Sequence, residues 1–70
     1  MTLGQKIKNR REELGYTQLE LAHKTQTCQS YISRLEHGDF NPSMQMIINI
    51  AVALDISIDN MLLGTERRAV

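Results

Sequence analysis

The sequence predicts an all-α protein, a compact bundle of five short helices, and three observations support this class. Apolar residues recur at helical spacing, and the strict alternation of a half-buried strand occurs nowhere. Capping residues and glycines divide the chain into short segments. Hydrophobic residues are 41% of the chain but aromatic residues only 4%, which suits a helical core. Because 70 residues have room for one core, we expect one domain over residues 1–64 and a frayed tail over 65–70.

The first predicted helix, over residues 3–14, carries a charged residue on its apolar face. Thr2 and Gln5 have the spacing of a capping box at its start. Arg11 lies on the same face as Ile7, one helical turn further along. A charged side chain in that position needs a partner from elsewhere in the chain.

The next two predicted helices are short and are separated by a polar turn. Thr17 and Glu20 form a second capping box, which predicts a helix over residues 18–24. Residues 25–27 are polar and lack apolar periodicity, which indicates a tight turn. A further helix is predicted over residues 29–36, and a glycine ends it.

Two more helices are predicted in the C-terminal half. Ser43 caps a helix over residues 44–54, and Ser57 caps a short helix over residues 58–63. The methionines of this half are interpreted as core-filling side chains rather than functional ones. These methionines are Met44, Met46 and Met61, and the predicted apolar face of the longer helix consists of Met44, Ile47, Ile48, Ala51 and Leu54.

The segment from Thr17 to Gly38 meets the packing requirement of a helix-turn-helix. Two helices that cross closely need a small residue at the crossing and apolar residues that fix the corner. Ala22 is the small residue, and the apolar contacts come from Leu21, Ile32 and Leu35.

These residues resemble the Cro/C1 repressor-type, or XRE-like, helix-turn-helix family. The resemblance rests on the sequences YTQLELA at 16–22, YISRLEHG at 31–38 and NPS at 41–43, and it extends over about residues 3–64. It implies the lambda-repressor-like fold, with the second and third helices forming the helix-turn-helix. It also implies a transcription regulator that binds double-stranded DNA as a homodimer on a two-fold operator. A bacterial or phage-encoded, cytoplasmic protein without a cofactor or small-molecule effector is expected.

The resemblance further implies which side chains contact DNA. The third helix should face inward with Ile32 and Leu35 and outward with its polar residues. Base reading is assigned to Gln29, Ser30 and Arg34, and phosphate contacts to Gln18, Ser33, His37 and Asn41.

Each of these assignments has an alternative that the sequence leaves open. The polar residues and Arg34 could be ordinary solvated surface. Tyr31 either packs beside the preceding helix or lies on a phosphate. In the resembled family, a basic residue of the first helix pairs with the glutamate that ends the third, and Arg11 and Glu36 occupy these positions.

Two residues of the turn depart from the family pattern. Gln26 stands where the family usually has glycine, and a non-glycine residue in the left-handed region costs about 1 kcal/mol. Thr27 stands where an aliphatic residue is usual, so we expect weaker packing at that corner.

Charge is distributed unevenly although the formal net charge is zero. Such a gradient is typical of a nucleic-acid face, and ordinary surface charge is the alternative. For Lys6, Lys8 and Arg10 in the first helix, approach to the DNA backbone and a solvated face are equally open. The charged residues of 35–66 are all acidic. The basic residues before position 35 are Lys6, Lys8, Arg10, Arg11, Lys24 and Arg34, and the acidic ones there are Glu12, Glu13 and Glu20.

Other functional classes find little support. Cys28 lies at the predicted cap of the third helix, where it is either a redox switch or a serine-like cap. One cysteine cannot form an internal disulfide, which fits the cytoplasm.

His23, His37 and Cys28 match no metal-site spacing, so no metal is expected. No nucleophile–base arrangement or carboxylate pair indicates an enzyme, and neither a spanning segment nor a signal peptide is visible.

The predicted function therefore needs a second copy of the chain. One recognition helix reads only a few base pairs, so such domains bind DNA as dimers. The expected dimer contact is the last helix, through Ile58, Met61 and Leu63. The alternative function is an antitoxin or a protein-interaction module built on the same fold.

Overall fold

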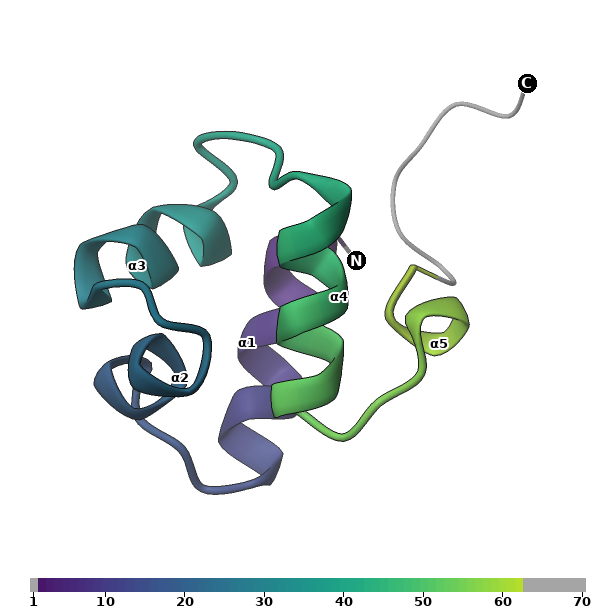
Figure 1. Ribbon diagram of the computed structural model, residues 1–70, viewed down its shortest axis with the longest axis horizontal. Helices are drawn as coiled ribbons and strands as arrows, with labels where there is room; N and C mark the ends of the chain where they lie inside the picture. The colour runs from purple at the N-terminus through teal and green to yellow at the C-terminus, as the bar shows by residue number, and fades with distance from the viewer. Residues whose placement is uncertain (1, 63–70) are drawn as a thin grey trace.

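The computed structural model describes residues 2–62, and in this range the secondary structure is helical throughout. The all-α prediction is confirmed. The predicted and observed bounds agree for the second helix and differ by one residue at the C-terminal ends of the first, third and fourth, while residue 63, the predicted end of the last helix, lies outside the described residues. The predicted tail over 65–70 lies outside the described residues. The helices are α1 (Leu3–Glu13), α2 (Gln18–Lys24), α3 (Gln29–His37), α4 (Met44–Ala53) and α5 (Ile58–Leu62) (Figure 1).

The predicted caps are present at the helix starts. The Thr2 hydroxyl accepts from the Gln5 N–H at 3.2 Å, and the Gln5 side chain accepts from the Thr2 N–H at 2.9 Å. Thr17 and Glu20 form the equivalent reciprocal pair at 3.0 and 2.7 Å. Because each cap satisfies backbone donors that a helix leaves unpaired, short helices such as α2 have defined ends. At the start of α4 the Ser43 hydroxyl accepts from the backbone N–H of Met46, and at the start of α5 the Ser57 hydroxyl accepts from the backbone N–H of Asn60.

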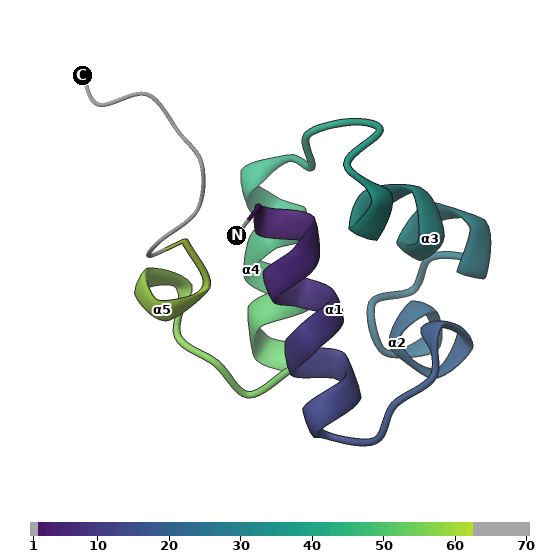
Figure 2. The ribbon, with the colours of Figure 1, turned by 180° about the vertical axis from the view of Figure 1, so that it is seen from behind.

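The helices arrange around one core. In Figure 1, α1 and α4 occupy the middle of the view, with α2 and α3 on one side and α5 on the other, and Figure 2 gives the same order from behind. α3 packs against α2 and α1, whereas α5 packs against α1 and α4. The buried apolar residues come from all five helices and the residue after α4: Ile7, Leu21, Ala22, Ile32, Leu35, Ile47, Ile50, Ala51, Leu54 and Met61.

The prediction for the apolar face of α4 is wrong at one end. Met44 begins the helix one turn beyond the part that the core covers, and it is 59% exposed. Ile50, which the prediction left out, is fully buried. The core-filling interpretation of the methionines is confirmed for Met61 and wrong for Met44, while Met46 is partly buried against the core.

A close contact between α1 and α3 sets the position of α3. A Cβ atom on Gly4 would lie 2.6 Å from the carbonyl oxygen of Glu36 and 2.7 Å from that of Leu35. Real side chains do not tolerate such distances, so only glycine lets the start of α1 approach the end of α3 this closely. Nothing in the apolar periodicity of the sequence indicated this contact.

Candidate nucleic-acid interface

The turn between α2 and α3 has the left-handed conformation that its family resemblance implied. Gln26 has a φ of +58°, a region that side chains other than glycine enter at a cost. The Thr27 N–H donates to the Ala22 carbonyl at 2.8 Å, which closes the corner over a fully buried Ala22. The turn therefore keeps its geometry despite the missing glycine.

Hydroxyl groups stabilise the corner where an apolar residue was expected. The buried Thr25 hydroxyl donates to the Leu21 carbonyl at 2.9 Å. Its oxygen also lies 3.0 Å from the Thr27 hydroxyl oxygen, within hydrogen-bond distance. These bonds satisfy polar groups that would otherwise be costly to bury. The polar turn is thus held by hydrogen bonds in place of the apolar packing that Thr27 cannot provide.

The outward face of α3 carries the residues assigned to base reading. Ile32 is fully buried and Leu35 nearly so, which confirms the inward face. The side chains on the opposite face are exposed and recur at helical spacing, so that they share one surface. This surface consists of Gln29, Ser30, Ser33, Arg34 and His37.

Arg11 and Glu36 form a buried ion pair between α1 and α3. Arg11 Nε donates to Glu36 Oε2 at 2.6 Å, and Arg11 Nη2 donates to Glu36 Oε1 at 3.1 Å. The hydrogen bond to the carboxylate raises the pKa of Arg11, although burial opposes this. The remaining nitrogen, Nη1, donates to the Tyr16 carbonyl at 2.8 Å. The bidentate contact between Arg11 and Glu36 holds α1 and α3 in a fixed relative orientation.

Gln18 joins this network from the start of α2. Its side-chain Nε2 donates to Glu36 Oε1 at 3.1 Å, and the residue is half-buried. The side chain thus links α2 to the end of α3. The family resemblance implied a phosphate contact for Gln18, and no sequence pattern indicated its bond to Glu36.

A hollow on the surface brings several predicted phosphate contacts together. It has a volume of about 280 Å³. A second hollow beside it shares Lys8, Glu36 and His37, and it also contains Asn41. Asn41 is therefore adjacent to the other predicted contacts without lining the same hollow. The first hollow is lined by Lys8, Gln18, Ser33, Arg34, Glu36, His37 and Asp39.

Three further residues lie close to this face. Asp39 pairs with His37 and Arg34, at 2.8 Å from His37 Nδ1 and 3.8 Å from Arg34 Nε. Tyr31 packs edge-to-face on Phe40, with ring centroids 5.0 Å apart, and burial raises the pKa of its hydroxyl. The structure thus shows Tyr31 packed against the loop after α3, a contact that neither alternative named, and the phosphate contact stays a prediction.

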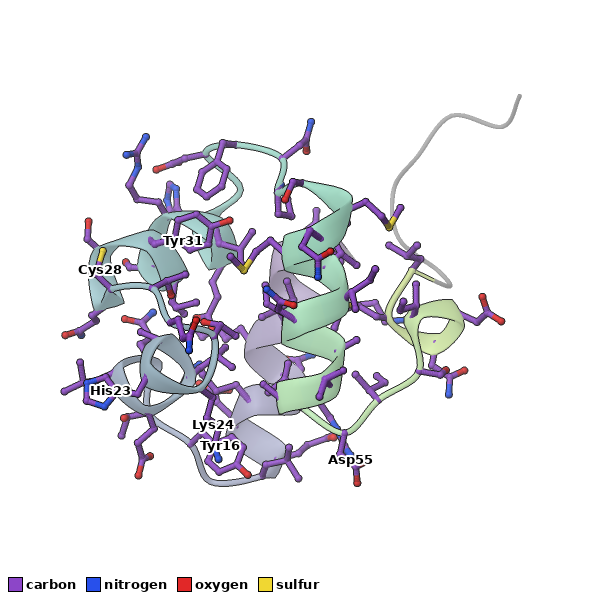
Figure 3. The ribbon with its side chains drawn as sticks, in the orientation of Figure 1. Tyr16, His23, Lys24, Cys28, Tyr31 and Asp55 are labelled. Atoms are coloured by element: carbon purple, nitrogen blue, oxygen red, sulfur yellow. The ribbon has the colours of Figure 1, made fainter. Side chains whose placement is uncertain are left out.

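Arg10 is directed away from the predicted DNA face. Its Nε donates to the Leu54 carbonyl at 2.9 Å, and its Nη2 donates to the Asp55 carbonyl at 3.1 Å. Asp55 lies in the turn after α4 (Figure 3). Arg10 therefore stabilises the end of α4, and its assignment to a solvated or DNA-approaching face is wrong.

Cys28 is the N-cap residue of α3, but its side chain makes no capping hydrogen bond. The interpretation as a serine-like cap is therefore wrong. The thiol is exposed at the edge of the molecule (Figure 3). Within residues 2–62, no group of three or more His, Cys, Asp or Glu side chains could hold a metal ion.

The predicted dimer residues differ in their exposure. Met61 is 1% exposed, because it fills the core between α5 and its neighbours, so its assignment to a dimer contact is wrong. Ile58 is half-buried and lines a surface groove between α4 and α5. Leu63 lies outside the described residues. Among the described helices, none is long and apolar enough to cross a membrane.

The packing of α3 on α2 across a closed turn defines a helix-turn-helix protein. A sequence model of a family described as helix-turn-helix matches residues 7–60. The chain belongs to this family, and its relatives place it with the Cro/C1-type members.

Curated relatives share this region of sequence. The chain is 39% identical over 61 residues to the HTH-type transcriptional regulator SinR of Bacillus subtilis (strain 168), covering 86% of this chain and 55% of SinR. It is 38% identical over 66 residues to the immunity repressor protein of Bacillus phage phi105, covering 94% of this chain and 45% of the repressor. The chain thus spans about half the length of the curated relatives it matches.

The fold also matches a solved protein–DNA complex. A crystal structure of SinR in complex with DNA superposes with a TM-score of 0.82 at 39% identity. The match covers 87% of this chain and 98% of the SinR chain. The DNA-binding domain of the P22 c2 repressor matches with a TM-score of 0.87 at 26% identity, covering 91% of this chain and 84% of that chain, which confirms the predicted lambda-repressor-like fold.

Proposed function

We propose that this protein is a transcription regulator that binds double-stranded DNA in a sequence-specific manner. The observation that carries the proposal is the exposed polar face of α3, held at a fixed angle by the buried Arg11–Glu36 pair. An α-helix with such a face fits the major groove of B-DNA. The similarity to the transcriptional regulator SinR, which has been solved in complex with DNA, and to the phage immunity repressor supports the same function.

The side chains of α3 have the chemistry needed to read base edges. Gln29 suits the bidentate contact to adenine, and Arg34 suits the contact to guanine. Ser30 can donate to or accept from either base type. All three are exposed on the outward face of α3.

The phosphate contacts come from the residues around this helix. Ser33 and His37 flank Arg34 in the hollow, and Asn41 lies beside it. Because the Gln18 amide already donates to Glu36, we assign the phosphate contact at α2 mainly to backbone N–H groups at the helix start. Gln18 then holds the end of α3 against that phosphate-binding helix start.

The proposed active form is a homodimer that uses the groove between α4 and α5. Val52 is 76% exposed and lines this groove together with Ile48, Ile56 and Ile58. A second copy that covered these side chains would bury apolar surface that one copy leaves in water. Sedimentation that shows only monomer at high micromolar concentration, with and without DNA, would rule out this form.

Selection of bound duplexes from a random pool tests the function directly. We expect enrichment of a two-fold sequence with half-sites about 10 bp apart. A salt series on the selected duplex should show a steep fall in affinity, because phosphate contacts release counterions. A folded protein that binds no duplex even at low salt would contradict the proposal and would favour a protein-interaction role, such as an antitoxin.

Two substitutions separate base reading from phosphate binding. Arg34→Ala should cost about 1–3 kcal/mol on the selected duplex and relax preference at one position. Gln18→Ala should weaken binding to selected and random duplexes by the same factor. Gln18 positions the start of α2, whose backbone N–H groups are proposed to bind a phosphate, and a phosphate contact is independent of sequence. Competition binding with both duplexes measures each effect. Equal losses for the two variants on both duplexes would contradict the assigned roles.

A further inference from the structure

Asp39 places a carboxylate at the face that is proposed to meet DNA. Its Oδ1 lies 2.8 Å from His37 Nδ1, and its Oδ2 lies 3.8 Å from Arg34 Nε. It also lines the hollow that contains Ser33. A negative charge in this position opposes the approach of a phosphate, so it is unexpected in a DNA-binding face.

The backbone holds Asp39 in this position. Gly38 ends α3 in the left-handed conformation, with a φ of +90°, and the chain then turns back over the last helical turn. The Asp39 N–H donates to the Arg34 carbonyl at 3.0 Å. The carboxylate is therefore anchored beside Arg34 by a helix-end motif and does not depend on a flexible loop.

Arg34 is bounded on a second side by Phe40. The centre of the Arg34 guanidinium lies 5.8 Å from the centroid of the Phe40 ring, and Phe40 itself packs against Tyr31. The ring and the carboxylate together restrict a side chain that is otherwise 63% exposed. The ion pair with the carboxylate is made at Nε, so the two outer nitrogens can still meet the O6 and N7 atoms of a guanine.

We infer that Asp39 is a specificity-determining residue, an inference that rests on the proposed DNA-binding function. Asp39 lowers affinity for the phosphate backbone of any sequence through its charge. It also positions Arg34 for a guanine edge. Both effects raise the ratio of specific to non-specific binding without any contact between Asp39 and a base.

Asp39→Asn tests this inference, because it removes the charge and keeps the size and the backbone N–H. We expect about threefold tighter binding to random duplex at low salt, since one repulsive charge near the phosphates is lost. Discrimination against a duplex with the contacted guanine replaced should fall about fivefold. Asp39→Ser, measured alongside, removes the carboxylate by a second route, and circular dichroism reports whether both variants fold.

Glu13→Gln is the matched control. It removes the same charge from an exposed carboxylate, which pairs with Arg10 at the end of α1 distant from α3 (Figure 2). A gain in affinity equal to that of Asp39→Asn would show a net-charge effect only and would overturn the inference. Unchanged affinity in Glu13→Gln, with a gain in Asp39→Asn, supports it.

Combining Asp39→Asn with Arg34→Ala separates the two effects of Asp39. If Asp39 positions Arg34, its substitution should no longer change guanine discrimination in the Arg34→Ala background. An equal loss of discrimination in both backgrounds would overturn the positioning role. If the wild-type protein binds no duplex, the proposed function fails with the inference. If the wild type binds and Asp39→Asn equals it on every duplex, the inference alone fails.

Discussion

Glu36 and Asp39 lie three positions apart at the end of α3, and each pairs with an arginine in a different environment. The Glu36 side chain is 4% exposed and is bound in a bidentate manner by Arg11. The Asp39 side chain is 42% exposed and lies at 3.8 Å from Arg34. The first pair is inaccessible to DNA, whereas the second is open to it.

The comparison shows how burial determines the effect of an ion pair. Breaking a buried pair leaves an uncompensated charge in the protein, and water cannot solvate it well. Breaking an exposed pair leaves two solvated charges, so stability changes little while the surface charge becomes available to a ligand. The end of α3 therefore contains one buried pair that holds helices together and one exposed pair that is proposed to affect binding.

The largest effect is expected for Glu36→Ala. Arg11 would remain buried without its main partner, at a cost of about 3–5 kcal/mol. A core of this size supplies a stability of only about 3–5 kcal/mol, so the variant should be largely unfolded at room temperature. Thermal denaturation followed by circular dichroism measures the change. Glu13→Ala, which removes an exposed carboxylate, is the control, and an unchanged melt for Glu36→Ala would contradict the role of the pair.

A smaller loss is expected for Gly4→Ala, which alters the helix contact beside Glu36. The new methyl group would lie 2.6–2.7 Å from two α3 carbonyl oxygens, so that the helices must separate, at a cost of about 1–3 kcal/mol. Helix propensity alone predicts the opposite sign, since alanine stabilises a helix by about 1 kcal/mol relative to glycine. Urea denaturation measures the change in the free energy of unfolding and so distinguishes a loss through the helix contact from a gain through helix propensity. A stabilised variant would show that α1 and α3 adapt without strain.

The smallest effect on stability is expected for Asp39→Asn. Exposed ion pairs contribute about 0–1 kcal/mol, so the melting transition should shift by no more than a few degrees. The same melting experiment as for Glu36→Ala provides the measurement. A loss as large as that of Glu36→Ala would show that Asp39 maintains the fold, and the contrast between the two carboxylates would disappear.

The elements of the fold could be predicted because their signals are local. Thr2 with Gln5 and Thr17 with Glu20 fix helix starts within a few residues of sequence, and the structure has both capping boxes. Ala22 and the turn at Gln26 could be placed for the same reason. The Arg11–Glu36 pair spans the fold, and only the family resemblance connected its two members.

The missed contacts depend on how separate segments meet in space. Gly4 looks like an ordinary helical residue until α3 is placed against it. Arg10 bonds to carbonyl groups more than 40 positions away, which no local pattern indicates. Met61 belongs to a short apolar helix whose inward side is set by α1 and α4, so its burial could not be read from α5 alone.

The position of Cys28 has a practical consequence for measuring binding. It is the only cysteine of the chain, it is exposed, and it begins α3 without contributing a capping bond. A thiol-reactive fluorophore would therefore attach at one defined place, next to the surface that is proposed to enter the major groove. Its emission would report the arrival of DNA in real time, and the rates of association and dissociation could be followed without labelling the nucleic acid.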